Sequence, residues 1–178
     1  MEFMSVACRS IEESEALFER YYEYLESVKE RMPREAYSFA AADWHYDHDD
    51  PRCPHDAWVE TLVVAEVASG TRAEIRDLEI RVRLLGAWHD GHIDLTYTKV
   101  QSYLFDTPRN LEYPMRSSKG HEDWIFDEMR LSDLGNVVHE VQFSGGSSWL
   151  IECEDLIYRW MPFEEQPPAP RRPPSQGS

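Results

Sequence analysis

A strict alternation of apolar and charged residues decides the fold of this chain: Asp77-Leu78-Glu79-Ile80-Arg81-Val82-Arg83-Leu84. Successive side chains of a β-strand point to opposite faces, so this pattern predicts a strand with one buried and one solvated face. Turn residues follow at 86–91, and the alternation resumes over 92–98. Sheets with one solvent-exposed face typically consist of antiparallel strands joined by short turns, so we expect an antiparallel sheet.

Similar short segments lie on both sides of this stretch. They cover Trp58–Ala65, Val100–Phe105, Trp124–Leu131, Val137–Phe143 and Trp149–Trp160, the last of them broken near Glu154-Asp155. Turn sequences rich in Gly, Ser and Asn separate the last three segments. The segments predict a mainly antiparallel sheet of roughly seven or eight strands, curled toward a barrel.

A helix precedes the strands. Ser10 and Glu13 have capping-box spacing, apolar residues then recur at helical intervals as far as Met32, and Pro33 ends the pattern. The apolar stripe predicts an amphipathic helix packed on the sheet. The next stretch, up to Ala42, suits either a short helix or an extended strand, and its pattern does not separate the two.

These elements predict an α+β fold in one domain, residues 1–163. Residues 164–178 are rich in proline and almost free of apolar side chains, so we expect a disordered tail there.

Composition narrows the possible partners. The chain has 178 residues and a formal net charge of -16, from 34 acidic and 18 basic side chains. Such a charge repels nucleic acid and anionic membranes and attracts basic surfaces. Residues 1–14 have no signal-peptide core, no stretch approaches membrane-spanning length, and three widely spaced cysteines give no disulfide framework. We therefore expect a cytoplasmic protein that does not bind nucleic acid or membrane.

The stretch from Trp44 to Trp58 concentrates histidines, aspartates and a cysteine between two tryptophans. His45, His48, Cys53 and His55 could hold one zinc ion if the loop curls, with nearby aspartates as supplementary ligands. Their spacing matches no standard zinc module. The simpler interpretation, which we favour, is a polar loop stiffened by prolines in which aspartates bond local amides, with no cofactor.

Four tryptophans suggest a recognition surface. Trp44, Trp58, Trp88 and Trp124 each lie close to a histidine or an acid at the end of an expected strand, and Trp88 is followed by His89 and Asp90. Together these six residues suit a sugar, a cationic ligand, or the Arg and Lys side chains of a partner protein. For each tryptophan taken singly, we favour the interpretation that it closes the core while its indole N–H bonds a nearby carboxylate.

No catalytic residue is indicated. His139 shares a strand face with Val137 and Val141, which favours a hydrogen-bonded histidine in or near the core, and Cys153 alternates with Ile151 as a buried thiol would.

One resemblance rests on three features. They are the strands within Leu78–Tyr103 around the turn Trp88-His89-Asp90-Gly91, the segment His139-Glu140-Val141-Gln142-Phe143, and the Gly-rich hairpin that follows it. In pattern, this region resembles small uncharacterised bacterial β-rich proteins, some of which are immunity partners of secreted toxins. The resemblance implies an acidic cytoplasmic protein that binds another protein.

Our leading hypothesis is therefore a non-enzymatic acidic interaction module, with an immunity-type inhibitor of a basic partner as its specific form. The alternatives are a metal-dependent hydrolase or metal-binding protein using loop 45–56, and a sugar or small-ligand binder using the strand-end tryptophans. The sequence does not give the oligomeric state.

Overall fold

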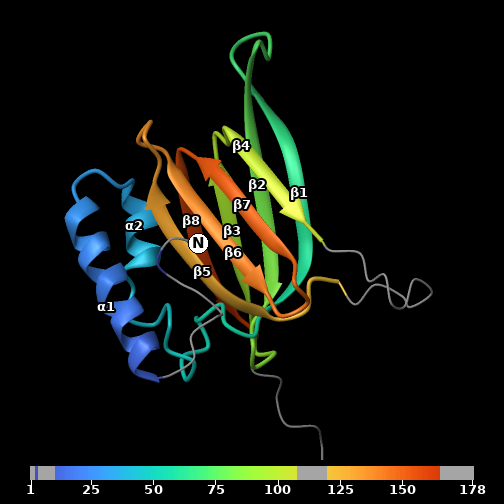
Figure 1. Ribbon diagram of the computed structural model, residues 1–178. Helices are drawn as coiled ribbons and strands as arrows, with labels where there is room; N and C mark the ends of the chain where they lie inside the picture. The colour runs from blue at the N-terminus through green and yellow to red at the C-terminus, as the bar shows by residue number, and fades with distance from the viewer. Residues whose placement is uncertain (1–2, 4–10, 108–119, 165–178) are drawn as a thin grey trace, which may run out of the picture.

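The computed structural model describes residue 3, residues 11–107 and residues 120–164 (Figure 1). In chain order the elements are α1 (Ile11–Val28), α2 (Arg34–Ala40), β1 (Trp58–Ser69), β2 (Ile75–Leu85), β3 (Gly91–Thr98), β4 (Ser102–Asp106), β5 (Trp124–Leu131), β6 (Val137–Phe143), β7 (Ser148–Cys153) and β8 (Asp155–Pro162). The predicted α+β class and antiparallel strands are confirmed. The ambiguous stretch after Pro33 is the helix α2.

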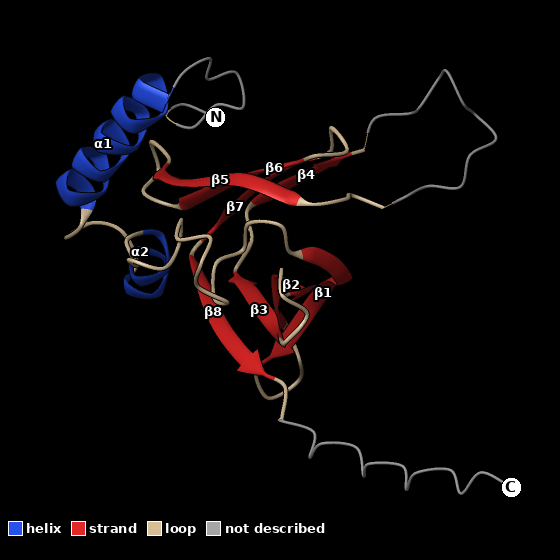
Figure 2. Ribbon diagram, turned by 90° about the horizontal axis from the view of Figure 1, so that it is seen from below, coloured by secondary structure: helices blue, strands red, loops and turns tan. Residues whose placement is uncertain are grey.

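The strands form two four-stranded sheets, ordered β1-β2-β3-β8 and β4-β7-β6-β5, instead of the single curled sheet that we expected. Figure 2 shows them as two layers, and neither is closed into a barrel. The chain passes between the layers twice at one place, at Lys99 and at Glu154. The Glu154 amide donates to the Thr98 carbonyl, and Lys99 Nζ lies 2.7 Å from Glu154 Oε2. The alternation of apolar and polar residues predicts each strand separately, and it does not predict where the chain crosses from one sheet to the other.

The core lies between the layers. Ile80, Val82 and Leu84 of β2 are buried, whereas Arg81 and Arg83 between them are exposed, as the alternation predicted. The opposite sheet contributes large aromatic side chains. Each aliphatic side chain buried in this way stabilises the fold by about 1.5–3 kcal/mol relative to an exposed one.

Both helices lie at strand edges on the same side of the molecule (Figure 1). The Tyr21 hydroxyl of α1 donates to the Met129 carbonyl and accepts from the Met129 amide, while the Tyr24 hydroxyl accepts from the Leu131 amide. Tyrosine hydroxyls thus satisfy backbone groups of β5, the last strand of its sheet. On the other sheet, α2 packs against β8, where the Ala36 amide donates to Asp155 Oδ1. Covering an edge in this way prevents unwanted strand pairing.

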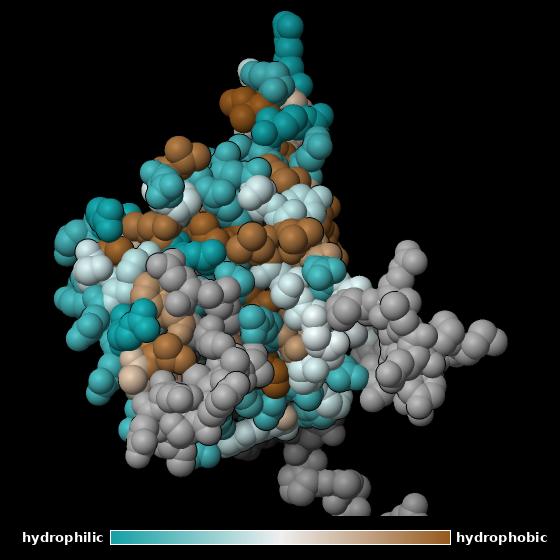
Figure 3. Space-filling model, viewed as in Figure 1, coloured by the Kyte–Doolittle hydropathy of each residue, from teal (hydrophilic) through white to brown (hydrophobic). Residues whose placement is uncertain are grey.

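The opposite edges, β1 and β4, are more open. Val63 and Val64 of β1 and Leu104 of β4 are exposed, and Leu104 faces the exposed Leu150 across the β4–β7 pair. Figure 3 shows apolar side chains in a band across the face where the strands of the second sheet lie. The molecule therefore has one side covered by helices and one side of exposed strand edges.

Of the expected tail 164–178, only Glu164 is among the described residues, and the rest lies outside them. Among the described residues, neither helix combines the length and apolar character needed to span a membrane.

Candidate functional site

A buried polar network joins the loop after α2 to both sheets. Asp127 of β5 accepts three hydrogen bonds: from His45 Nε2 at 3.0 Å, from His139 Nε2 at 2.9 Å and from Trp124 Nε1 at 3.0 Å. His139 Nδ1 lies 2.9 Å from the Tyr97 hydroxyl of β3. All these side chains are inaccessible to solvent or nearly so.

The partners fix the charge of His45. Its Nδ1 lies 2.8 Å from the Phe39 carbonyl oxygen, which can only accept, while its Nε2 faces the Asp127 carboxylate. An imidazole that donates from both nitrogens is protonated and positive, so His45 and Asp127 form a buried ion pair. His139 can remain neutral, because the Tyr97 hydroxyl can donate to its Nδ1 while its Nε2–H donates to Asp127.

Asp127 is held ionised by these neighbours. Burial alone raises the pKa of this carboxyl, but the positive charge of His45 and the hydrogen bonds from His139 and His45 outweigh burial and hold the pKa well below its ordinary value of 3.8.

The lowered pKa of Asp127 predicts that the folded protein loses stability at low pH. A carboxyl whose pKa is lower in the folded chain binds protons more readily when unfolded, so its stabilisation is complete above about pH 4 and is lost as the pH falls further. We expect the midpoint of urea unfolding to decline steeply below pH 4. An Asp127→Asn variant has no carboxyl at this position and is expected to show a shallower decline. Equal declines in the two proteins would contradict the assignment.

The members of the network do not face the pocket described below. A general acid or base must come within hydrogen-bond reach of its substrate. Asp127, His45 and His139 are buried, and none of them lines the pocket described below. The expectation that His139 is a hydrogen-bonded core residue is confirmed, as is that of a buried Cys153, whose pKa burial raises to about 12.

The four residues considered for zinc are engaged in other contacts. Both nitrogens of His45 are engaged in the network, and Cys53 Sγ donates to the His45 carbonyl oxygen at 3.0 Å. His48 and His55 stack on each other with ring centroids 3.9 Å apart. Within residues 11–107 and 120–164, no group of three or more His, Cys, Asp or Glu side chains is placed to hold a metal ion.

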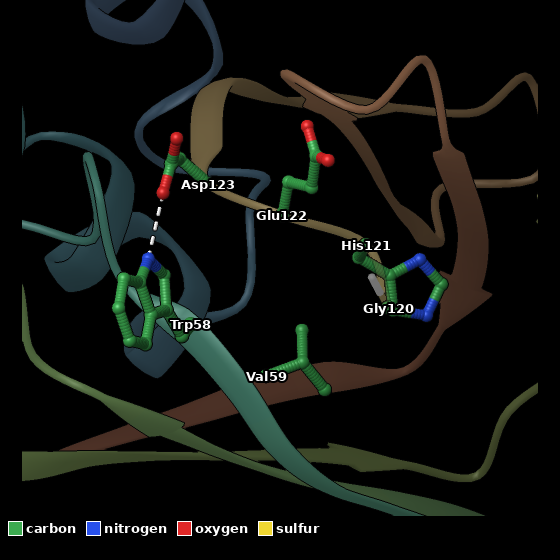
Figure 4. Close-up of a pocket in the computed structure, with 6 residues that line it drawn as sticks. All are labelled: Trp58, Val59, Gly120, His121, Glu122 and Asp123. Atoms are coloured by element: carbon green, nitrogen blue, oxygen red, sulfur yellow. Dashed lines mark hydrogen bonds between the residues drawn. The ribbon is translucent and has the colours of Figure 1, made fainter. Parts of the chain in front are cut away.

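A pocket of about 490 Å³ opens at the end of the sandwich where β1 and β5 begin. It is lined by Trp58 and Val59 of β1 and by Gly120, His121, Glu122 and Asp123, which lead into β5. Figure 4 shows the side chains around this space, with the Trp58 indole bonded to Asp123 on one side and His121 on the other. Its volume lies within the usual range of ligand sites, about 300–1,000 Å³.

Asp123 is fixed in position within the pocket wall. Its carboxylate accepts from Trp58 Nε1 at 2.6 Å and from the Ser144 hydroxyl at 3.2 Å, and its backbone forms a bridge with Trp58. A carboxylate accepts several hydrogen bonds, so one more donor can be accommodated. The indole remains 48% exposed, which leaves ring surface for contact with a ligand.

His121 forms the apolar part of the wall. Its ring packs against Phe143 and Trp149, with centroids 5.0 and 5.1 Å away, and burial lowers the pKa of its imidazole. His121 Nδ1 is buried and has no hydrogen-bond partner among the described residues. Because this nitrogen is buried, it is not exposed to the pocket.

The turn between β2 and β3 extends this surface. The His89 ring lies 4.8 Å from the Trp58 ring, and its chain neighbour Trp88 is 56% exposed. Glu60 Oε2 lies 3.0 Å from His92 Nε2, close to the same end of β1. Aromatic rings and carboxylates thus continue beyond the pocket.

The six residues proposed for recognition divide into two groups. Trp58, Trp88, His89 and Asp90 lie at the pocket end of the sandwich. Trp124 is in the core, and Trp44 packs on Tyr158 and beneath the Arg52 guanidinium, with centroid distances of 4.5 and 5.4 Å.

Sequence reasoning did not single out Glu122 and Asp123 as site residues. One signal is present in the sequence: the order His, acid, any residue, Trp, branched aliphatic occurs at both 55–59 and 121–125. Both strands do begin at the tryptophan, and the bridge between Trp58 and Asp123 places them side by side.

Comparison with known proteins adds no relative: no family model, curated protein or solved structure matches this chain.

Proposed function

We propose that this protein is a non-enzymatic, cytoplasmic interaction module that binds a basic partner protein at the pocket of Trp58, Val59 and residues 120–123. The observation that carries the proposal is the half-exposed Trp58 ring held against the fixed Asp123 carboxylate. An immunity-type inhibitor, which covers a basic surface of a toxin, is the specific form that we favour.

The pocket suits an Arg or Lys side chain. A cation over an indole face gains about 0.5–2 kcal/mol, depending on how far it is desolvated, and a nearby carboxylate adds a charge-assisted hydrogen bond. Asp123 supplies the carboxylate and Trp58 supplies the face. The neutral His121 completes the wall without repelling a cation.

The charge of the whole chain favours the same partner. A net charge of -16 attracts a basic protein over distances of about a Debye length and accelerates encounter, while a buried aromatic anchor slows dissociation. A high net charge also favours solubility, so charge by itself does not indicate a partner. The pocket is the feature that points to a binding site.

The test is affinity capture with the full chain as bait, in low and moderate salt, followed by titration of the purified partner. We expect a partner with a basic surface whose affinity falls as salt rises. Trp58→Ala is expected to weaken binding by about thirtyfold or more, as for a central aromatic residue of an interface, and Asp123→Asn by about tenfold.

Asp133→Asn is the matched control. Asp133 is exposed in the β5–β6 turn, at the end of β5 opposite Asp123, and its substitution changes the net charge equally. It should alter affinity less than about twofold. If Asp123→Asn and Asp133→Asn weakened the affinity equally, overall charge alone would explain the binding. That result would refute binding at the pocket. Failure to capture any protein partner in low salt would refute the function itself.

A further inference from the structure

The end of the described chain lies beside the pocket. The Phe163 amide donates to the Asp90 carbonyl oxygen at 2.7 Å, and the Phe163 ring packs on His92, whose Nε2 contacts Glu60 of β1. Asp90 follows His89, the residue whose ring touches Trp58. The chain therefore leaves β8 within a few residues of the pocket wall.

The sequence that follows has the chemistry the pocket would bind. Residues 165–178 contain Arg171 and Arg172, the only adjacent pair of basic residues in the chain, and a single acid, Glu165. This segment is net positive in a chain whose net charge is -16. Prolines surround the arginines at positions 167, 168, 170, 173 and 174. Proline-rich segments bind aromatic-lined surfaces at a low cost in entropy, because proline already restricts the backbone.

The length of the segment permits contact. Arg171 lies seven positions after Glu164, and at about 3.1 Å per position an extended proline-rich chain spans about 22 Å. A short tether also gives an effective concentration on the order of millimolar, so even a contact with a millimolar dissociation constant is formed about half of the time.

From this position, charge and length, we propose that the segment Pro167–Pro174 docks on the surface of Trp58, Asp123 and the Trp88-His89-Asp90 turn, with Arg171 or Arg172 in the pocket. The inference rests on the proposed function in that both assign a basic side chain to the same pocket. Its consequence is competition, because a partner must displace the chain's own arginine.

The first test compares full chains by NMR, using the indole N–H of Trp58, assigned with a Trp58→Phe variant. The double variant Arg171→Ala/Arg172→Ala is expected to shift the Trp58 indole signal and the amides of residues 120–123. The control, Arg72→Ala/Arg76→Ala, removes the same charge near the far end of the β1–β2 hairpin and is expected to leave those signals unchanged. Identical spectra for wild type and Arg171→Ala/Arg172→Ala would overturn the proposal.

The second test adds the contact back in trans. A synthetic peptide of residues 165–178, titrated into the Arg171→Ala/Arg172→Ala chain, is expected to restore the Trp58 shift with a dissociation constant of about 1 mM. The same peptide with both arginines replaced by alanine should give at least tenfold weaker shifts. Equal shifts with the two peptides would contradict arginine recognition.

The outcomes separate this inference from the proposed function. If the tail docks and no partner protein binds, the proposed function fails and the inference stands. If a partner binds through Trp58 and the spectra show no docking, only the inference fails. If both hold, Arg171→Ala/Arg172→Ala should raise the partner's affinity about twofold or more, because an intramolecular competitor is lost.

Discussion

Replacing Asp127 with alanine is expected to lower the free energy of unfolding by about 3–5 kcal/mol, the usual cost of leaving one member of a buried ion pair alone. The substitution leaves the N–H groups of His45, His139 and Trp124 without their acceptor. In a chain of this size, the melting temperature should fall by about 6–20 °C. Urea unfolding followed by circular dichroism measures the loss.

Asp127→Asn separates hydrogen bonding from charge. The introduced amide oxygen can accept from Trp124, and its NH₂ group can donate to His45 and His139 once both imidazoles are neutral. We therefore expect less than half of the loss caused by alanine. Asp133→Ala, at an exposed position, should cost less than about 0.5 kcal/mol. If the free energy of unfolding of Asp127→Ala lay within 1 kcal/mol of that of the wild type, the stabilising role of the network would be contradicted.

Replacing Trp149 with alanine is expected to cost about 3–5 kcal/mol, as for other large core aromatic residues. Trp149 is fully buried on β7, and its ring contacts those of Phe105, His121, Trp124 and Phe143. Truncation opens a cavity at the centre of this cluster and removes the support of the pocket wall at His121. Unfolding should be followed by circular dichroism, because the substitution changes tryptophan fluorescence.

The Trp149→Phe variant tests whether the loss of stability comes from lost packing. Trp149 Nε1 has no hydrogen-bond partner among the described residues, so Trp149→Phe loses packing volume but no hydrogen bond. We expect Trp149→Phe to cost less than half as much as Trp149→Ala, and Trp88→Ala, at an exposed tryptophan, less than about 0.5 kcal/mol. Equal costs for the phenylalanine and alanine variants would show that the indole N–H matters.

Alternation predicted individual strands well. The expected segments 124–131 and 137–143 coincide with β5 and β6. In β6 buried residues alternate with partly exposed ones, whereas in β5 Asp127, Glu128 and Met129 are buried in succession. The partner of each strand was not predictable in the same way. β4 pairs with β7, which lies more than 40 residues later in the chain, and this pairing depends on the crossings at Lys99 and Glu154.

The candidate sites show the same limit at the level of single residues. Trp58 and Trp124 occur in the same local pattern, yet one is half exposed and the other is buried. His45 and His48 lie three residues apart in a polar loop, yet only His45 reaches Asp127, 82 positions away. Local sequence determines what a side chain can do chemically, and tertiary packing determines whether solvent or a ligand can reach it.

The central claim is that a basic partner binds at the pocket, and hydrogen–deuterium exchange of the full chain with and without the captured partner tests it most directly. We predict that binding protects the backbone amides of residues 57–60 and 120–123. Protection confined to the exposed strands around Val63 and Leu104, with the pocket amides unchanged, would contradict the claim.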